Sequence, residues 1–207
     1  MITTAWGYTL RDLEELDPLL SLTEFDAMTA YKYSNDVRLP SLIKATSAAV
    51  RNYCGWHIAP AAACLLNERL YAGNGRIKQV DTDLLIQLPA TFVSDVTGIY
   101  IDGGEVSTFA VETNGLLRAF NVGKLIDTKA PIIVVYNAGR DEGFDDVKEL
   151  VANRVVHALS NSAGVSNETA GGVSVSYSSA WINGGGASAI SDLDAGILTP
   201  YKLEGMY

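Results

Sequence analysis

Two amphipathic helical patterns lie far apart in this chain, with a long stretch of strand-like sequence between them. Residues 40–54 and 144–162 both place apolar side chains at intervals of three and four, the spacing of one helix face. Neither apolar stripe can be covered by its own short neighbours. We therefore expect these two helices to pack against each other, with the intervening residues inserted between them.

The inserted stretch has the hydrophobic period of β-strands. From about residue 65 to residue 136 apolar and polar side chains alternate, and residues 132–136 form a nearly continuous apolar run. Turn signals separate the strands at residues 73–75, 102–104 and 114–115, each containing glycine next to asparagine or aspartate. This pattern predicts a small antiparallel sheet of about five or six strands.

The predicted fold class is α+β. It has a helical core, with helices at about 40–54 and 144–162 packed together, an inserted small antiparallel β-sheet and an extended C-terminal tail. The expected parts are an N-terminal helical extension at 1–38, the helical core at 39–64 and 140–164, the inserted β domain at 65–139, and an extended strand and tail at 165–207.

The N-terminal extension carries two short helical patterns. Leu10, Leu13 and Leu16 recur at helical spacing before Asp17 and Pro18 end the pattern. Thr23 is then placed to cap a second helix that begins at Glu24. We expect both segments to be helical.

Charge and composition narrow the classes of partner. Hydrophobic residues make up 48% of the chain and charged residues 19%, as in a globular protein, and the net charge is −9. Lysine and arginine occur singly, so no basic run is available to follow a phosphate backbone. Sequence-specific nucleic-acid binding is not expected, whereas a surface past which DNA moves without adhering fits this acidity.

The chain lacks the sequence signals of a membrane or exported protein. No apolar run reaches the ~18 residues that a membrane-spanning helix needs, and the first residues lack the charged-then-apolar pattern of a signal peptide. We expect a soluble protein made in a cytoplasm, with Cys54 and Cys64 as reduced thiols.

No combination of residues predicts catalysis or a bound cofactor. Cys54, His57 and Cys64 offer three ligands of the kind that zinc prefers, but the fourth ligand and the usual paired spacing are absent. A buried helix end with small apolar cysteines is the simpler interpretation. His57 and His157 are the chain's two histidines, and no Gly-x-Ser-x-Gly elbow accompanies them. We expect no catalytic residue, no cofactor and no metal.

The segment after the second long helix combines glycine-rich sequence with uncovered apolar residues. Val173, Val175 and Tyr177 alternate with serines, which is typical of a strand with one apolar face. Such a segment docks either on its own domain or on a neighbouring subunit, and strand addition to a partner's sheet is one route. The residues expected to bind a partner protein or a neighbouring subunit are Val173, Val175, Tyr177, Trp181, Ile182, Ile197, Leu198, Tyr201, Leu203 and Tyr207.

Three stretches in this order resemble the head–tail connector, or adaptor, proteins of tailed bacteriophages. The first is residues 41–58, a helix that runs into a Cys-Gly-Trp corner. The second is the inserted sheet, with residues 88–89, 96–104, 114–118 and 133–139. The third comprises residues 145–152, 164–177 and 198–203. Each motif alone is hydrophobic pattern plus glycine, and their order and spacing over residues 40–203 carry the likeness.

The resemblance implies a structural virion protein of the phage neck and not an enzyme. Such adaptors form a homo-oligomeric ring, dodecameric in relatives, below the portal protein, and they extend the DNA channel. A downstream stopper or tail-terminator protein attaches to the ring, and double-stranded DNA passes through it without sequence-specific binding. The implied location is the head–tail interface of a virion assembled in a bacterial cytoplasm, with no membrane partner. A helical core would build the ring, and C-terminal segments would reach along the portal.

Two other functions remain open on the sequence. The inserted sheet suits a binding module for a carbohydrate or another virion protein, in which Tyr71, Tyr100 and Phe109 stack on sugar rings. A hydrolase would rest only on scattered serine, histidine and aspartate residues, without the geometry that defines a triad.

Overall fold

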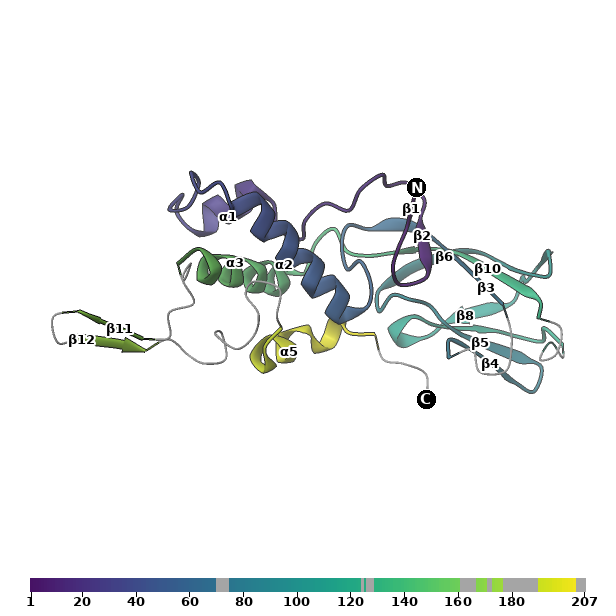
Figure 1. The fold of residues 1–207 in the computed structure, drawn as a ribbon. Coiled ribbons are helices and arrows are strands. Elements are labelled where there is room, and N and C mark those ends of the chain that lie inside the picture. Colours follow the sequence, from purple (N-terminus) through teal and green to yellow (C-terminus); the bar gives the residue numbers. More distant parts are fainter. Residues whose placement is uncertain are drawn as a thin grey trace. The chain divides into compact units, whose positions relative to one another are not determined.

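The computed structural model describes residues 1–69, 75–123, 125, 129–160, 167–170, 173–176 and 190–203, and its helices and strands are drawn in Figure 1. They group into two compact units. The first, the β unit, comprises Met1–Leu16, Gly55–Asp141 and Tyr201–Tyr207. The second, the helical unit, comprises Asp17–Cys54 and Glu142–Pro200. The chain therefore enters each unit more than once.

A six-stranded antiparallel sheet forms much of the β unit, in the order β1-β2-β3-β10-β6-β7. These strands are β1 (Ile2–Thr3), β2 (Tyr8–Leu10), β3 (Ala62–Arg69), β6 (Val93–Ile101), β7 (Gly104–Glu105) and β10 (Pro131–Ala138). Across the sheet Cys64 lies opposite both Leu10 and Tyr136, and all three side chains are fully buried. Strand alternation thus places one row of core side chains across three strands.

A second antiparallel sheet has four strands, in the order β4-β5-β9-β8. They are β4 (Ile77–Val80), β5 (Asp83–Gln87), β8 (Phe109–Val111) and β9 (Leu116–Ala119), and a short 3-10 turn, η1 (Thr113–Gly115), precedes β9. Leu84, Ile86 and Leu117 alternate with more exposed residues and are fully buried. One face of this sheet therefore contributes to the core of the β unit.

The helical unit contains the helices α1 (Leu22–Met28), α2 (Leu39–Cys54), α3 (Asp145–Ser160) and α5 (Asp192–Leu198), and the strands β11 (Asn167–Ala170) and β12 (Val173–Ser176). The last helix is followed by a 3-10 turn, η3 (Thr199–Tyr201). β11 and β12 pair with each other as an antiparallel hairpin. Within the described residues no other strand pairs with this hairpin.

The two long helices form where the sequence predicted them, and α2 packs against α3. Ile43, Val50 and Cys54 of α2 are buried, as are Val147, Val151 and Val155 of α3. These positions are the apolar stripes of the two sequence patterns. Gly55, with φ of +81°, ends α2 in the left-handed conformation that glycine adopts without strain.

The predicted fold class, a helical core with a small inserted sheet, is wrong. About as many residues lie in strands as in helices, 29% against 31% of the chain, and the strands build two antiparallel sheets, so the fold is β-rich. The six-stranded sheet also takes in β1 and β2, from a segment that the sequence assigned to a helical extension. Strand pairing between distant segments, which local periodicity does not encode, accounts for the difference.

Two local expectations for the N-terminal region are also corrected. Leu10 does not belong to a helix but lies in β2, where it pairs with Cys64 and is fully buried. The second helix begins earlier than expected and is capped by Ser21, not Thr23. Ser21 and Glu24 make a complete capping box, a stronger start signal than a lone threonine.

Candidate functional site

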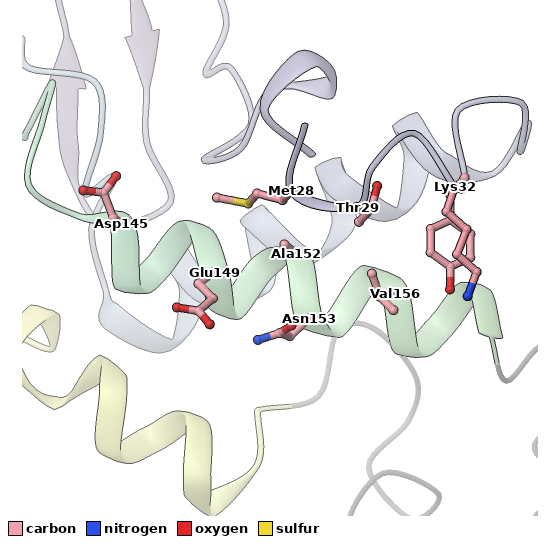
Figure 2. A pocket seen from close by; sticks show the side chains of 9 residues that line it. Met28, Thr29, Lys32, Asp145, Glu149, Ala152, Asn153 and Val156 are labelled. Carbon is pink, nitrogen blue, oxygen red and sulfur yellow. The ribbon is translucent and has the colours of Figure 1, made fainter. Parts of the chain in front are cut away.

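A groove of about 550 Å³ lies in the helical unit between α3 and the chain that follows α1 (Figure 2). Nine side chains line it: Met28, Thr29, Lys32, Tyr33, Asp145, Glu149, Ala152, Asn153 and Val156. All of them come from residues 28–33 or from α3. The geometry of the groove therefore depends on how α1 is held against α3.

A capping box and an ion pair fix the α1 side of the groove. The backbone N–H of Glu24 donates to Ser21 Oγ at 3.2 Å, and the backbone N–H of Ser21 donates to Glu24 Oε2 at 2.9 Å. The remaining oxygen of Glu24 accepts from Lys148 Nζ on α3 at 2.7 Å. One carboxylate thus starts α1 and joins it to the first half of α3.

The chain turns sharply after α1 and is tied to α3 a second time. Ala30 and Tyr31 have φ of +48° and +61°, a left-handed conformation that is uncommon for residues other than glycine. The backbone N–H of Tyr31 donates to Asp26 O at 2.8 Å, which closes the turn. Beyond it, the Tyr33 hydroxyl lies 2.9 Å from Ser160 Oγ at the end of α3. Side-chain bonds therefore connect the two walls near both ends of the groove.

Charge is distributed unevenly along the groove. Asp145 and Glu149 place exposed carboxylates toward the start of α3, while Lys32 lies near Val156, farther along the helix (Figure 2). The Lys32 ammonium is 5.0 Å from the centre of the Tyr33 ring, within cation–π range. Met28, Ala152 and Val156 supply apolar surface between the two ends.

The ion pair shifts the titration of Glu24. The hydrogen bond from Lys148, followed by those from Ser21, lowers the pKa of Glu24 to about 2 from an ordinary 4.5. The carboxylate is therefore charged throughout the neutral and mildly acidic range. Hydrogen bonds from Ser160 and Lys32 lower the pKa of the Tyr33 phenol below its ordinary 10.0.

A buried ion pair holds α5 against α3 in the same unit. Arg154 and Asp194 are 4% and 6% exposed, and the Arg154 guanidinium donates through Nε to Asp194 Oδ2 at 3.0 Å and also through Nη2. The Ser191 N–H and hydroxyl donate to the same oxygen at 2.9 and 2.5 Å. Burial raises the pKa of Asp194, but these hydrogen bonds outweigh it, so the pKa lies below its usual value. Asp194 is consequently ionised and paired.

The structure places the predicted partner-binding residues of the C-terminal segment in different environments. Leu198 is fully buried, Tyr201 is 7% exposed and Leu203 is half-buried, whereas Ile197 remains 42% exposed. Val173 and Val175 belong to β12, paired with β11. Tyr177, Trp181, Ile182 and Tyr207 lie outside the described residues.

Residues at the end of the described chain contact the β unit to which they belong. The Trp56 indole N–H donates to the Tyr201 carbonyl at 2.5 Å, and the Arg140 guanidinium lies 5.9 Å from the Tyr201 ring centre. A Cβ added at Gly55 would lie 3.5 Å from Leu203 Cδ1. Tyr201 and Leu203 are therefore engaged by their own chain.

His57 is held as a buried structural group. Its Nε2 lies 3.1 Å from the Ala138 carbonyl, which only accepts, so Nε2 carries the proton of the neutral ring. Its Nδ1 then accepts from the Tyr8 hydroxyl at 2.7 Å, and that hydroxyl in turn accepts from the His57 N–H at 3.1 Å. This network occupies both ring nitrogens, which a metal ligand or a catalytic base would need to keep available.

The two cysteines are buried and unlinked. Burial raises the pKa of the Cys64 thiol to about 12, so the thiol stays protonated at neutral pH and is a poor nucleophile. Among the described residues no group of three histidine, cysteine, aspartate or glutamate side chains is placed to hold a metal ion.

A second hollow of about 410 Å³ lies in the β unit. Its lining mixes carboxylates and hydroxyls with apolar side chains: Ile101, Asp102, Gly104, Glu105, Val106, Ser107, Thr108, Phe120, Asn121, Val122 and Leu125. Of the three aromatic residues considered for sugar stacking, Tyr100 and Phe109 lie in different sheets, and Tyr71 falls outside the described residues. The aromatic ring that lines this hollow is Phe120.

Sequence reasoning missed the groove and the buried ion pair. No sequence pattern connects Met28 and Lys32 with Asp145 and Glu149, which lie more than a hundred residues further along the chain. A start signal for α5 is nevertheless present in the sequence, because Ser191 and Asp194 have capping-box spacing. The pairing of Asp194 with Arg154 has no comparable local signal.

Comparison with protein-family models finds no match for this chain, and comparison with curated proteins finds no significant one. In the described part of the chain no helix is both long enough and apolar enough to cross a membrane.

Proposed function

We propose that this chain is a structural virion protein, a head-to-tail adaptor that forms a ring below the portal. The ring extends the DNA channel and offers an attachment surface for the next neck or tail protein. Neighbouring copies, the portal and a downstream stopper or tail-terminator protein are its partners. It carries out no catalysis.

The observation that carries this proposal is the uncovered apolar surface at two places in the helical unit. Met28, at the end of α1, is 51% exposed, and Leu193 of α5 is 79% exposed. Leu193 lies one helical turn from Ile197, which is 42% exposed, and a patch of neighbouring apolar side chains in water is typical of an interaction surface. A cyclic ring requires two different faces on each subunit, because each copy contacts its two neighbours in different ways.

The charge of the chain supports the same function. With a net charge of −9, the surface repels the phosphate backbone at moderate ionic strength. A channel protein benefits from this repulsion, because DNA must pass without adhering. The proposed contacts with the portal or a neighbouring copy remain the C-terminal residues after α3, among them Val173, Val175, Trp181 and Ile197.

Mass measurement of single particles tests the proposal. The purified chain is measured alone and after mixing with the portal protein encoded by the same genome, over a range of salt concentrations. We expect ring-sized particles, or a portal complex heavier by many copies of the chain. A protein that stays monomeric and leaves the portal mass unchanged in every condition would refute the proposal.

A second candidate function is a binding module for a carbohydrate or another virion protein. The hollow in the β unit favours it, because Phe120 next to Ser107 and Asn121 combines a flat apolar ring with hydrogen-bonding groups. A glycan array with Phe120→Ala as the matched variant tests this function. Reproducible binding that the substitution abolishes would favour it, and an array without signal would exclude carbohydrate recognition at this hollow.

A further inference from the structure

We propose that the outer face of α5 from one copy docks in the α1–α3 groove of the next copy. This inference rests on the proposed function, since it names the contact that would join neighbours in the ring. The outer face of α5 is defined here as Leu193, Gly196 and Ile197.

The outer face of α5 is apolar and uncovered. Leu193 and Ile197 are one helical turn apart, 79% and 42% exposed, and between them a Cβ added at Gly196 would meet no atom within 4 Å. The inner positions, Asp194 and Leu198, are buried. Ion pairing fixes the inner side of α5, and its outer side is left for a partner.

The groove has a matching shape and surface. Its α3 wall from Asp145 to Val156 is about 18 Å long, whereas α5 is about 10 Å long, at ~1.5 Å per residue. The central part of the lining is apolar, with Met28 51% exposed, Val156 half-buried and Ala152 buried at its base. Docking would remove Met28, the exposed part of Val156 and the outer face of α5 from water, which is the main source of favourable free energy in such contacts.

Charge selects one direction for the docked helix. Asp192, at the start of α5, is exposed. In the docked arrangement its carboxylate lies near the ammonium of Lys32, which lines the neighbour's groove beside Val156. The reverse direction would place Asp192 beside the carboxylates of Asp145 and Glu149, where like charges repel. The docked α5 therefore runs antiparallel to α3, with Ile197 toward Met28.

A copy does not fill its own groove. Arg154, which binds α5, is two residues from both Ala152 and Val156, about 160° around the helix axis from these two groove residues. The groove and α5 thus occupy different sides of α3. Because the two surfaces of the contact are different, association is head-to-tail and closes into a ring when the rotation permits.

Disulfide trapping between two differently labelled chains tests the contact. Met28→Cys is mixed with Ile197→Cys, so any bond between them joins two molecules, and both native cysteines are buried. The matched control mixes Val37→Cys with Ile197→Cys, because Val37 is 93% exposed but does not line the groove. Cross-linked dimer is followed over time under mild oxidation, with the parent chain as background.

We expect Met28→Cys to couple to Ile197→Cys about tenfold faster than the control pair does, because docking raises the local thiol concentration. Equal or slower coupling than the control overturns the inference, since Val37→Cys is the more accessible thiol. If rings form in the mass measurement without this preference, the adaptor function stands and the docking contact is wrong. Selective coupling by a chain that never binds portal would support the contact and contradict the adaptor function.

Discussion

At the scale of single residues, the helical unit depends on charges that are paired away from water. Arg154 and Asp194 are both almost completely buried, and the capping box of Ser191 and Asp194 uses the same carboxylate to start α5. Removing one partner of a buried ion pair lowers stability strongly, because the other charge stays buried without its counter-charge. The net contribution of the intact pair to stability is smaller than this loss, because both charges had to leave water on folding. The value of this pair therefore lies in fixing α5 at one place on α3.

Removing one member of this pair should destabilise the protein strongly. For Asp194→Ala we expect a loss of about 3–5 kcal/mol, because the Arg154 guanidinium stays buried without its carboxylate. Urea unfolding followed by circular dichroism measures the loss. Asp192→Ala, two residues away and exposed, is the matched control and should change stability by less than about 0.5 kcal/mol. An equal effect of both substitutions would show that the buried pair has no special role.

The ion pair between α1 and α3 should make stability depend on acid pH. Glu24 has a pKa of about 2 in the folded chain and 4.5 as its ordinary value. Its depressed pKa stabilises the fold above pH 4.5, and this contribution is lost as the pH falls from there toward 2. Because the Glu24 side chain is 41% exposed, solvent screening limits the contribution to about 1 kcal/mol or less.

We therefore expect Glu24→Gln to lower the free energy of unfolding at pH 7 and to have a smaller effect at pH 3. Urea titrations of the parent and the variant at both pH values give the comparison. Asp26→Asn, another carboxylate of α1 that has no part in the pair with Lys148, serves as the control. A difference between parent and Glu24→Gln that is unchanged or larger at pH 3 would contradict the assigned role of Glu24.

At the scale of elements, the sequence predicted the helices whose apolar pattern lies within one continuous segment. The apolar stripes of α2 and α3 each lie within one continuous segment, so their period alone placed both helices. β2 has three residues and is defined by pairing with β3, where Tyr8 lies opposite Leu66 and Leu10 opposite Cys64. No local period marks such a strand, and the spacing of Leu10, Leu13 and Leu16 gave a wrong helix. The groove could not be predicted for the same reason. Its two walls are held together by the contact of Glu24 with Lys148, two residues that are far apart in the sequence.

The proposed contact between α5 and the groove should respond to reversal of charge. Lys32→Glu places a like charge opposite Asp192 of the neighbour and should slow the trapping of Met28→Cys with Ile197→Cys several-fold. Adding Asp192→Lys to the Ile197→Cys chain should restore the rate, since opposite charges again face each other. Lys44→Glu in α2, another exposed lysine outside the groove, controls for the change in net charge. Failure of the reversed pair to recover would argue against the predicted direction of docking.

At the scale of the whole molecule, the chain divides into a β unit and a helical unit with different features. The β unit contains the six-stranded and the four-stranded sheets and the hydrogen-bond network around His57. The helical unit presents the groove and the outer face of α5, the two surfaces that the adaptor function would use. Composition indicates a globular acidic protein. The division into two units could not be predicted from it, because three segments that are distant in the sequence build the β unit.

Electron microscopy of the chain bound to its portal tests the adaptor function most directly. The chain and the portal protein of the same genome are combined, and the complex is reconstructed without imposed symmetry. We predict a closed ring of this chain below the portal, coaxial with the DNA channel, with α5 of each copy in the α1–α3 groove of the next. A portal whose lower surface stays bare, or a chain bound at scattered positions without a ring, would contradict the account.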